Sequence, residues 1–364
     1  MKKRAIVDRP LLIITIILCV IGGIFVFSAS WPTAVLKFEN GYYFILLHMR
    51  SLALGFFCLF VSMNIPYKTY KKYAIPLMII GLVLNLLLFT SFGSDSLGST
   101  RWLKIRFLPR FMPSDVLKMT SIIFIASICS SLGKNIRMFR NFILIVIFTG
   151  VSVGIVLIRD MGSAMVMAVA LGSIILAAGI KFRYVLILLM LGGGGLYYNM
   201  TPYRLERITG FLDPFGDTSD LTYQLVNSLY ALAMGGITGV GLGKGVQKFS
   251  YIPHVYNDFI FAVIGEEFGL VGAASLVILF FLFIWRGYLI AFNSKDKFGK
   301  YLALGFSTLI GVQAFIHIMV NIGLLPVTGI TLPFISFGGT SLMVTLYATG
   351  IILNISKENS GSIK

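Results

Sequence analysis

Residues 201–258 read TPYRLERITGFLDPFGDTSDLTYQLVNSLYALAMGGITGVGLGKGVQKFSYIPHVYND, and they interrupt a sequence that is otherwise almost continuously apolar. The segment holds five of the fourteen acidic residues of the chain, namely Glu206, Asp213, Asp217, Asp220 and Asp258. Hydrocarbon offers no hydrogen-bonding partners to irregular, charged chain, so a segment of this kind must lie at a water interface. We therefore expect an integral membrane protein whose chemistry takes place at one membrane surface.

The composition is that of a polytopic membrane protein with one domain over residues 1–364. Hydrophobic residues make up 57% of the chain and charged residues 12%, whereas a soluble domain has about 25% charged residues. Apolar runs of about 20 residues predict ten spans, at 11–30, 44–64, 75–92, 114–132, 141–158, 162–180, 184–200, 259–285, 301–322 and 334–355. The predicted fold class is all-α, with about ten transmembrane helices and a long extracytoplasmic loop, 201–258, between helices 7 and 8.

The placement of positive charge predicts the orientation. The net charge is +16, but the basic residues gather in short clusters between apolar runs, as topology signals do, and this excludes nucleic acid as a partner. With ten spans, one side of the membrane receives 18 of the 30 Lys and Arg residues. These are Lys2, Lys3, Arg4, Arg9, Lys68, Lys71, Lys72, Lys134, Arg137, Arg140, Lys181, Arg183, Arg286, Lys295, Lys297, Lys300, Lys357 and Lys364. We therefore expect both termini to lie in the cytoplasm.

Two loops on the opposite side carry cations that the topology rule does not explain. The loop at 93–113 contains Arg101, Lys104, Arg106 and Arg110, and the long loop contains Arg204, Arg207, Lys244 and Lys248. One interpretation is a patch that meets lipid headgroups. The other is a binding site for an anionic, lipid-linked substrate.

Three acidic residues mark the point where the long loop enters a span. Asp258 precedes the apolar run, and Glu266 and Glu267 follow it a little over two helical turns deeper. Asp258 either performs chemistry or caps the helix. The two glutamates either face a cavity or form a salt bridge with a buried cation such as Lys118. Asp213, Asp217 and Asp220 are expected to shape turns.

Signatures of soluble enzymes are absent from the sequence. There is no Walker A motif, no HExxH motif and no cluster of Cys and His with the spacing of metal ligands. The segment GVGLGKG at 239–245 lacks the Ser or Thr that ends a nucleotide loop.

Several motifs, spread over essentially the whole chain, are similar to those of the SEDS family (shape, elongation, division and sporulation), the group of FtsW, RodA and SpoVE. They are FSAS at 27–30, RWLKI at 101–105, MPSDVLKM at 112–119, RDMGSA at 159–164, RITGFLDPFGD at 207–217, YIPHVYNDFIFAVIGEEFGLVG at 251–272 and NIGLLPVTGITLPFISFGGTSL at 321–342. The amino-acid sequence of the long loop resembles the FtsW and SpoVE branch more than the RodA branch.

The sequence departs from the family pattern at five positions. Asn257 stands where Thr is usual, Tyr256 replaces a common His, and His254 follows the proline where Glu is common. Asp115 replaces Glu, and Arg159 replaces Pro. These changes bear on rate and accessory groups more than on the type of reaction.

The resemblance implies a peptidoglycan glycosyltransferase that polymerises lipid II into glycan strands for cell division, cell shape or sporulation. A hydroxyl must lose its proton as it attacks the sugar, and Asp258 is the expected general base. The leaving pyrophosphate is already an anion, so it needs cations and not a second carboxylic acid. Candidate substrate contacts are Arg101, Trp102, Lys104, Lys118, Arg204, Arg207, Gln224 and Ser336. For Gln224 and Ser336, hydrogen bonds that pack the helices are the alternative.

The resemblance also implies partners. A class B penicillin-binding protein, which is a transpeptidase, and other divisome or elongasome proteins are expected to bind. A divalent cation, Mg²⁺ or Mn²⁺, is a second means of neutralising the pyrophosphate, and no residues in the sequence identify ligands for it.

Two other classes of function stay open from the sequence. A flippase or transporter for lipid-linked precursors would also use intramembrane carboxylates and a charged cavity, but near the midplane of the membrane. A non-catalytic divisome scaffold is the second alternative. Because the polar residues gather at one surface, the sequence favours the enzyme.

Overall fold

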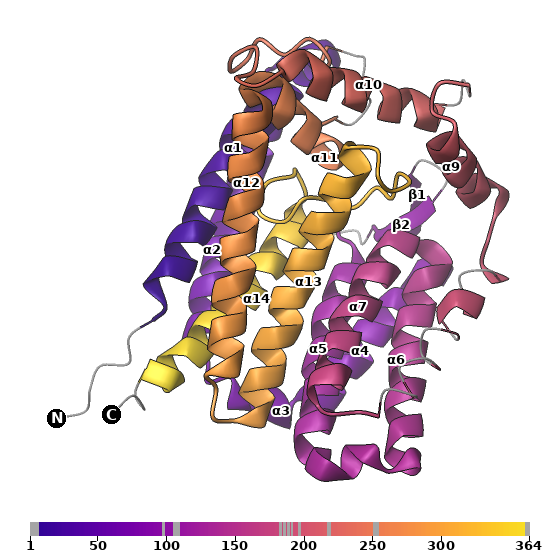
Figure 1. Cartoon of the computed structure of the whole chain (residues 1–364), viewed down its shortest axis with the longest axis vertical. Coiled ribbons are helices and arrows are strands. Elements are labelled where there is room, and N and C mark those ends of the chain that lie inside the picture. Colours follow the sequence, from indigo (N-terminus) through magenta and orange to yellow (C-terminus); the bar gives the residue numbers. More distant parts are fainter. Residues whose placement is uncertain are drawn as a thin grey trace.

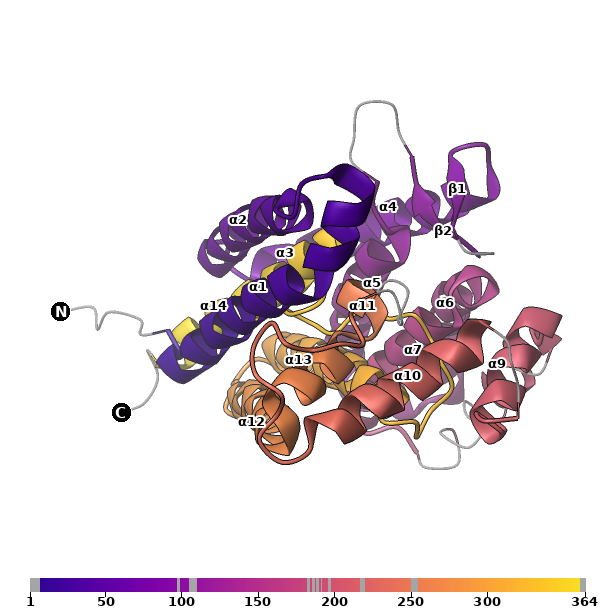
Figure 2. The same ribbon diagram turned by 90° about the horizontal axis from the view of Figure 1, so that it is seen from above.

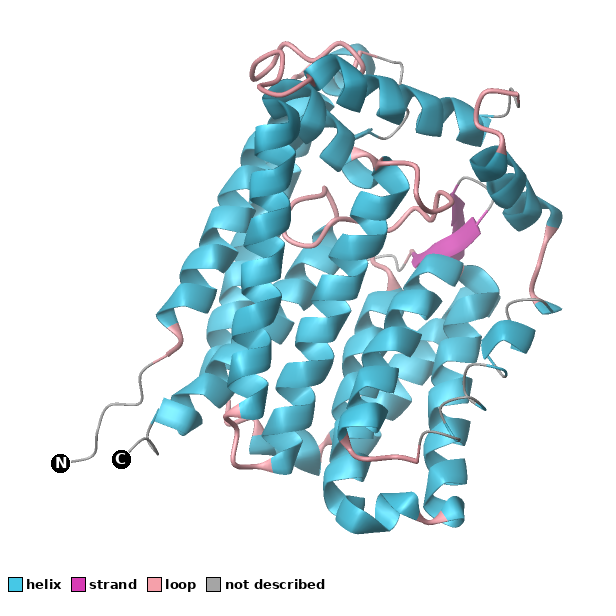
Figure 3. Ribbon diagram, in the orientation of Figure 1, coloured by secondary structure: helices cyan, strands magenta, loops and turns pink. Residues whose placement is uncertain are grey.

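The computed structural model describes residues 7–96, 99–104, 110–181, 184, 187, 190, 192–195, 198–216, 220–249 and 255–360. In this part of the chain the fold is a helical bundle with one two-stranded hairpin (Figures 1 and 3). The helices are α1 (Arg9–Phe38), α2 (Tyr43–Asn64), α3 (Lys68–Lys72), α4 (Ala74–Leu86), η1 (Leu87–Phe89), α5 (Pro113–Leu132), η2 (Gly133–Arg137), α6 (Phe139–Arg159), α7 (Met161–Ala177), α9 (Pro202–Leu212), α10 (Asp220–Gly235), α11 (Val255–Asp258), α12 (Ile260–Phe292), α13 (Lys297–Asn321) and α14 (Gly339–Ser360). The strands are β1 (Gly93–Ser96) and β2 (Ser99–Leu103), paired antiparallel.

The helical membrane fold predicted from the sequence is confirmed. Among the described residues, seven helices are long and apolar enough to cross a membrane, and two shorter apolar helices, Ala74–Phe89 and Met161–Ala177, accompany them. These correspond to nine of the predicted spans. The predicted span at 184–200 lies largely outside the described residues, so the total of ten stays a prediction.

Several predicted boundaries were wrong, such as the end of α12, which lies at Phe292 and not at 285, and two of them have a clear structural cause. The first helix is longer than 11–30, because Asp8 caps it by accepting a hydrogen bond from the Leu11 N–H and the helix continues to Phe38. The last helix begins at Gly339 and not at 334, since residues 323–338 form an apolar but irregular loop. Side chains of α13 satisfy its backbone: the Gln313 amide donates to the Thr331 carbonyl at 2.9 Å, and His317 Nδ1 lies 2.8 Å from the Ile330 carbonyl. We call residues 323–338 the signature loop.

The two ends of the bundle differ in structure. The hairpin, α9, α10 and α11 lie at one end, and α3 and η2 lie at the other, where α1 begins and α14 ends (Figure 1). Seen from above, α9 and α10 lie across the ends of the vertical helices (Figure 2). The segment 201–258, predicted from the sequence as a loop, therefore contains helices. We call this end of the bundle the loop end.

A kink in α12 joins the long segment to the bundle. Gly269 has φ 63° and ψ −163°, a conformation that only glycine adopts readily. At the kink, two backbone N–H groups and two carbonyls of α12 lose their partners within the helix. The turn at 236–241 supplies a new partner for each of the four groups. The four bonds between the segments are Leu270 N–H to Gly236 O (2.9 Å), Val271 N–H to Ile237 O (3.1 Å), Val240 N–H to Glu266 O (3.0 Å) and Gly241 N–H to Glu267 O (3.0 Å). The glycine-rich turn thus supplies the hydrogen bonds that the kinked helix lacks.

A buried polar cluster lies beside the kink. Lys248 Nζ is 2.7 Å from Glu267 Oε1, and the hydroxyl of Ser28 donates to the same oxygen at 2.7 Å. Glu266 Oε1 accepts from the N–H groups of Val246 and Gln247 at 2.6 and 3.2 Å. We call Ser28, Lys248, Glu266 and Glu267 the kink cluster.

Of the two alternatives for the glutamates, the salt bridge to a buried cation is confirmed for Glu267, whereas Glu266 binds backbone N–H groups, and Lys118 was the wrong partner. Lys118 instead lies 2.8 Å from Asp115, one turn earlier in α5. Lys248 reaches Glu267 only because the turn folds back onto α12. It therefore lies outside the group of substrate cations.

Candidate active site

Asp258 is the last residue of the four-residue helix α11. Its side chain is half-buried. The cap position of α12 belongs to Phe259 and has no side-chain capping bond. The capping role that the sequence left open for Asp258 is therefore wrong. Nor does its carboxylate have an ion pair within 4.0 Å or a side-chain hydrogen bond among the described residues.

Asn321, the last residue of α13, fixes the backbone around Asp258. Its Nδ2 donates to the Asp258 carbonyl at 3.1 Å, and its Oδ1 accepts from the Ala262 N–H at 3.1 Å. The carbonyl of Asn321 accepts from the Ser228 hydroxyl of α10 at 2.8 Å. Because Asn321 is completely buried, these bonds do not compete with water. One side chain thus joins α11, α12 and α13 beside the carboxylate.

The signature loop holds α11 from the other side. The Ser336 hydroxyl donates to the Asn257 carbonyl at 2.7 Å and accepts from the Leu332 N–H at 2.8 Å. The Phe337 N–H donates to the Tyr256 carbonyl at 3.0 Å. Ser336 was predicted as a substrate contact, but its hydroxyl is engaged with backbone. We therefore revise its role to positioning α11.

Two arginines approach the same region from different elements. Arg101, in β2, donates from Nη1 to the Gly329 carbonyl at 3.4 Å, and its Nη2 lies 3.8 Å from Asp160 Oδ1. Arg207, in α9, donates to the Val327 carbonyl at 3.0 Å. Residues more than 100 positions apart in the chain thus form one cationic group facing the signature loop.

Gly329 leaves space between the Arg101 guanidinium and the Asp258 carboxylate. Its φ is +68°, and a Cβ added there would lie 3.1 Å from Arg101 Nη1 and 3.6 Å from Asp258 Oδ2. Any other residue would be strained in the left-handed region and would fill this space. The signature loop therefore keeps carboxylate and guanidinium adjacent with room between them.

The two carboxylates of the site differ in acidity. Burial raises the pKa of Asp258 to about 6, although Arg101 and Arg207 oppose the rise, and the nearby Asp160 adds to it. Burial also disfavours the charge on Asp160, but the Arg101 charge and the hydrogen bonds from Ser163 outweigh it and lower the pKa of Asp160. Asp160 therefore stays ionised near neutral pH, while Asp258 is poised to exchange a proton.

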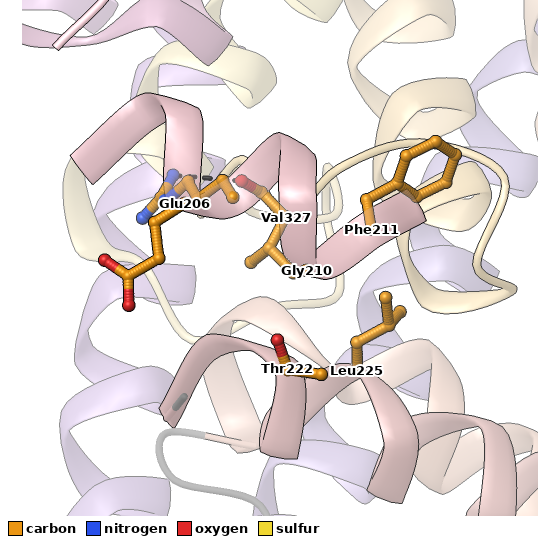
Figure 4. Close-up of a pocket in the computed structure, with 7 residues that line it drawn as sticks. Glu206, Gly210, Phe211, Thr222, Leu225 and Val327 are labelled. Atoms are coloured by element: carbon orange, nitrogen blue, oxygen red, sulfur yellow. Dashed lines mark hydrogen bonds between the residues drawn. The ribbon is translucent and has the colours of Figure 1, made fainter. Parts of the chain in front are cut away.

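A narrow cavity adjoins Arg207 between α9, α10 and the signature loop (Figure 4). Its volume is about 10 Å³, room for about one water. The lining residues are Glu206, Arg207, Gly210, Phe211, Thr222, Leu225 and Val327. The cavity thus lies where the long segment 201–258 meets the signature loop, which carries Gly329.

Other predicted residues have different positions. Arg204 donates to the carbonyls of Asn199, Leu157 and Ile158 at 2.6, 2.8 and 3.1 Å, so it holds the end of α6. Its pKa is lowered by burial and by the Arg101 charge. We revise its role from substrate contact to support of the site.

The remaining predicted contacts lie around this centre. Lys118 is paired with Asp115, and its charge also helps to lower the pKa of Asp160. Trp102 pairs with Ser94 across the hairpin, and Lys104 is exposed directly after β2. Gln224 is half-buried on α10, one turn before Ser228. Arg106 and His254 lie outside the described residues.

Residues 9–361 match the family described as FTSW_RODA_SPOVE, cell cycle protein. The chain belongs to this family. A relative from Geobacter sulfurreducens, "Probable peptidoglycan glycosyltransferase FtsW", is 35% identical over 98% of this chain and 96% of its own length. "Stage V sporulation protein E" of Bacillus subtilis is 37% identical over 98% of both chains.

Solved structures share the fold of this family member over nearly its whole length. One, described as "Structural coordination of polymerization and crosslinking by a peptidoglycan synthase complex", has a TM-score of 0.80 and 25% identity, covering 97% of this chain and 98% of that chain. The rod shape determining protein RodA of Thermus thermophilus has a TM-score of 0.73 and 23% identity, covering 97% of both chains.

The departures from the family pattern have structural consequences here. The Tyr256 ring packs against Phe44 and Phe337, with centroids 4.6 and 5.8 Å away, beneath the signature loop. The Arg159 guanidinium lies 4.6 Å from the centroid of the Phe89 ring. Both side chains therefore take part in the packing around the site.

The side chains of this family member do not form a metal cage in the part of the chain that the structure describes. No group of three or more His, Cys, Asp or Glu side chains comes together there. Arg101, and not a third carboxylate, lies between Asp160 and Asp258. The residues therefore fit an anion better than a metal ion, and the metal requirement stays a prediction.

Three residues of the site were missed from the sequence. Asp160 belongs to RDMGSA, and Asn321 and Gly329 belong to the segment at 321–342. An acidic residue between two apolar runs was a usable signal for Asp160. The roles of Asn321 and Gly329 depend on which carbonyl and which charge lie beside them, and sequence spacing does not give this.

Proposed function

We propose that the protein is a peptidoglycan glycosyltransferase that polymerises lipid II. The observation that carries this function is a half-buried carboxylate, Asp258, whose pKa is raised to about 6 and which faces Arg101 across the space at Gly329. Family membership and the names of the relatives support the reaction class.

In the proposed reaction, Asp258 accepts the proton of the acceptor sugar 4-hydroxyl. The hydroxyl oxygen forms a bond with the anomeric carbon of the donor, and the bond from that carbon to the pyrophosphate breaks, with its electron pair going to the leaving oxygen. A base with a pKa near the working pH removes the proton most effectively. A single displacement at an α-linked donor gives a β-linked product.

The arginines stabilise the pyrophosphate as it leaves. Arg101 and Arg207 supply fixed positive charge where negative charge develops, and a guanidinium can donate two parallel hydrogen bonds to a phosphate. Asp160 lies 3.8 Å from Arg101 and orients it without neutralising the whole group. A second carboxylic acid is unnecessary, since the leaving group departs as an anion.

In the proposed orientation the loop end faces the extracytoplasmic side of a bacterial plasma membrane. Both termini are then cytoplasmic, as the basic clusters favour. The polyprenyl tails of donor and acceptor would stay in the lipid while the sugars and pyrophosphates meet the site at the interface. A class B penicillin-binding protein is the proposed partner, and the likeness to a peptidoglycan synthase complex supports it.

A gel assay for glycan strands tests the proposal. Purified protein in detergent, with lipid II and with or without the transpeptidase, should give a ladder of polymers. A flippase needs a sealed membrane and gives no ladder in detergent. A scaffold gives none in any setting, so the absence of polymer with the partner present would reject the enzyme.

A further inference from the structure

A cationic cleft lies at the end of the bundle opposite Asp258. It has a volume of about 280 Å³ and is formed where η2, the end of α7 and the start of α13 meet. Its lining residues are Gly133, Ile136, Arg137, Ala178, Lys297 and Tyr301. α5, α7 and α13 each run from this end to the loop end, so the length of the bundle separates the cleft from the candidate active site (Figure 1).

Two cations from different helical connections line the cleft. Arg137 Nε donates to the Gly179 carbonyl at 3.2 Å, which fixes the guanidinium beside the end of α7. Lys297 reaches towards η2, because a Cβ added at Gly133 would lie 3.7 Å from its Nζ. Both side chains are exposed. Neither has an acidic partner within 4.0 Å among the described residues.

None of the described residues that line the cleft is acidic. The nearest acidic residue in sequence, Asp296, caps α13 by accepting from the Gly299 N–H at 3.1 Å. The positive charge of Arg137 and Lys297 is therefore available to an external anion.

The cleft also has an apolar part. Ile136 and Tyr301 are buried, 1% and 6% exposed, and form apolar wall beside the two cations. Met138 and Leu176, neighbours in sequence of lining residues, expose 59% and 53% of their surfaces. In a membrane protein, exposed apolar residues at a helix end face lipid. The cleft thus places two positive charges at the rim of the lipid-facing surface.

We propose that this cleft binds the phosphodiester headgroup of an anionic membrane phospholipid. The phosphate accepts hydrogen bonds from Arg137 and Lys297, and the acyl chains lie against the apolar rim. Basic pockets between membrane helices select anionic lipids in this way. The inference rests on the membrane fold and is independent of the proposed glycosyltransferase function.

Native mass spectrometry of the whole purified protein tests the site. The probes are phosphatidylglycerol and phosphatidylcholine with identical acyl chains, which differ in headgroup charge. The wild-type protein should retain phosphatidylglycerol preferentially. The double variant Arg137→Gln with Lys297→Gln should lose that preference on the order of tenfold, since each cation near the membrane surface contributes attraction.

The matched control is Arg140→Gln with Lys295→Gln. Both residues are exposed, lie at the same end of the bundle and carry the same charges, but neither lines the cleft. This variant should keep the wild-type preference. Equal loss in both double variants would mean that general surface charge and not the cleft attracts the lipid, and would overturn the site.

Two further measurements cover the other outcomes. If inorganic phosphate at millimolar concentration displaces phosphatidylglycerol, the cleft is a site for a free anion and the lipid assignment is wrong. If the double variant unfolds at a lower temperature than wild type without added lipid, the exposed single variant Lys297→Glu replaces it. Retained preference for phosphatidylglycerol in Lys297→Glu would also overturn the proposal.

Discussion

Asp258 and Glu267 are close in sequence and opposite in character. Glu267 is 1% exposed, and one of its oxygens is shared by the Lys248 ammonium and the Ser28 hydroxyl. Asp258 is half-buried at the loop end and faces Arg101 only across the space at Gly329. Asp258 ends α11 just before α12 begins, and Glu267 lies about two turns inside α12.

The difference shows how the fold separates structural from reactive charge. A buried carboxylate with close partners holds two segments together, and its charge is unavailable to a substrate. A carboxylate with a raised pKa and an open face can accept a proton from a ligand. The kink cluster fixes the α12 segment that follows Asp258, so the structural glutamates support the reactive aspartate.

The largest expected effect is the loss of activity in Asp258→Asn. Removing the general base should lower polymerisation by about 10²–10⁴-fold, measured as glycan strands from lipid II. The control is Asp213→Asn, because within the described residues the Asp213 side chain accepts one hydrogen bond, from the Gly216 N–H of its own turn at 3.1 Å. Polymerisation at the wild-type rate in Asp258→Asn would remove Asp258 as the base.

The stability of Asp258→Asn sharpens this prediction. The pKa of Asp258 is raised to about 6 in the folded protein, so the folded state holds this proton more tightly than the unfolded state does. The resulting stabilisation is fully present below the unfolded pKa and is lost as the pH rises through about 6. At pH 8 the variant should therefore unfold at a temperature equal to or above that of wild type. A marked drop would identify a structural carboxylate like Glu267.

Lys248→Met should have the opposite signature, with a large effect on stability. It leaves Glu267 buried without its cation, which should lower the free energy of unfolding by about 3–5 kcal/mol. Thermal unfolding in detergent measures it. The double variant Lys248→Met with Glu267→Gln should recover more than half of the loss, and failure to recover would show that the ion pair is not the cause.

Asn321→Ala tests whether the site depends on positioning. Loss of the bonds to the Asp258 carbonyl and the Ala262 N–H should shift the carboxylate, so kcat should fall on the order of tenfold to a hundredfold while KM changes little. Ser228→Ala is the control, because its hydroxyl bonds only to the Asn321 carbonyl among the described residues. A rise in KM without a fall in kcat would contradict a positioning role.

The smallest effect is expected in the pH profile of Arg101→Ala. Wild-type kcat/KM should fall as pH drops below about 6, since the base must be ionised. Arg101 lowers the pKa of Asp258, so its removal should move this limb to higher pH and raise KM for lipid II. Arg110→Ala, exposed in the same loop, should change neither. An unshifted limb would place Arg101 outside the field of Asp258.

Much of the fold followed from the sequence because hydrocarbon imposes few solutions. Apolar runs of helical length must become helices, as the nine matching helices show. The exception is the start of the last predicted span. Residues 334–338 are apolar enough to be assigned to a span, yet they form a loop. Their backbone finds partners within the protein: the Ile335 and Ser336 N–H groups donate to the Leu332 carbonyl, and the Phe337 N–H donates to the Tyr256 carbonyl.

The sequence by itself determined that this is a membrane protein, that its polar residues gather at one surface, and that Asp258 and Arg101 belong to the candidate site. Those properties depend on residue type and order along the chain. Only the tertiary structure decided that Lys248 pairs with Glu267, that Arg204 and Ser336 hold backbone, and that Asp160, Asn321 and Gly329 lie at the site. Charge and hydrogen bonding act over a few ångströms in space, and residues that are far apart in sequence become neighbours only when the helices pack.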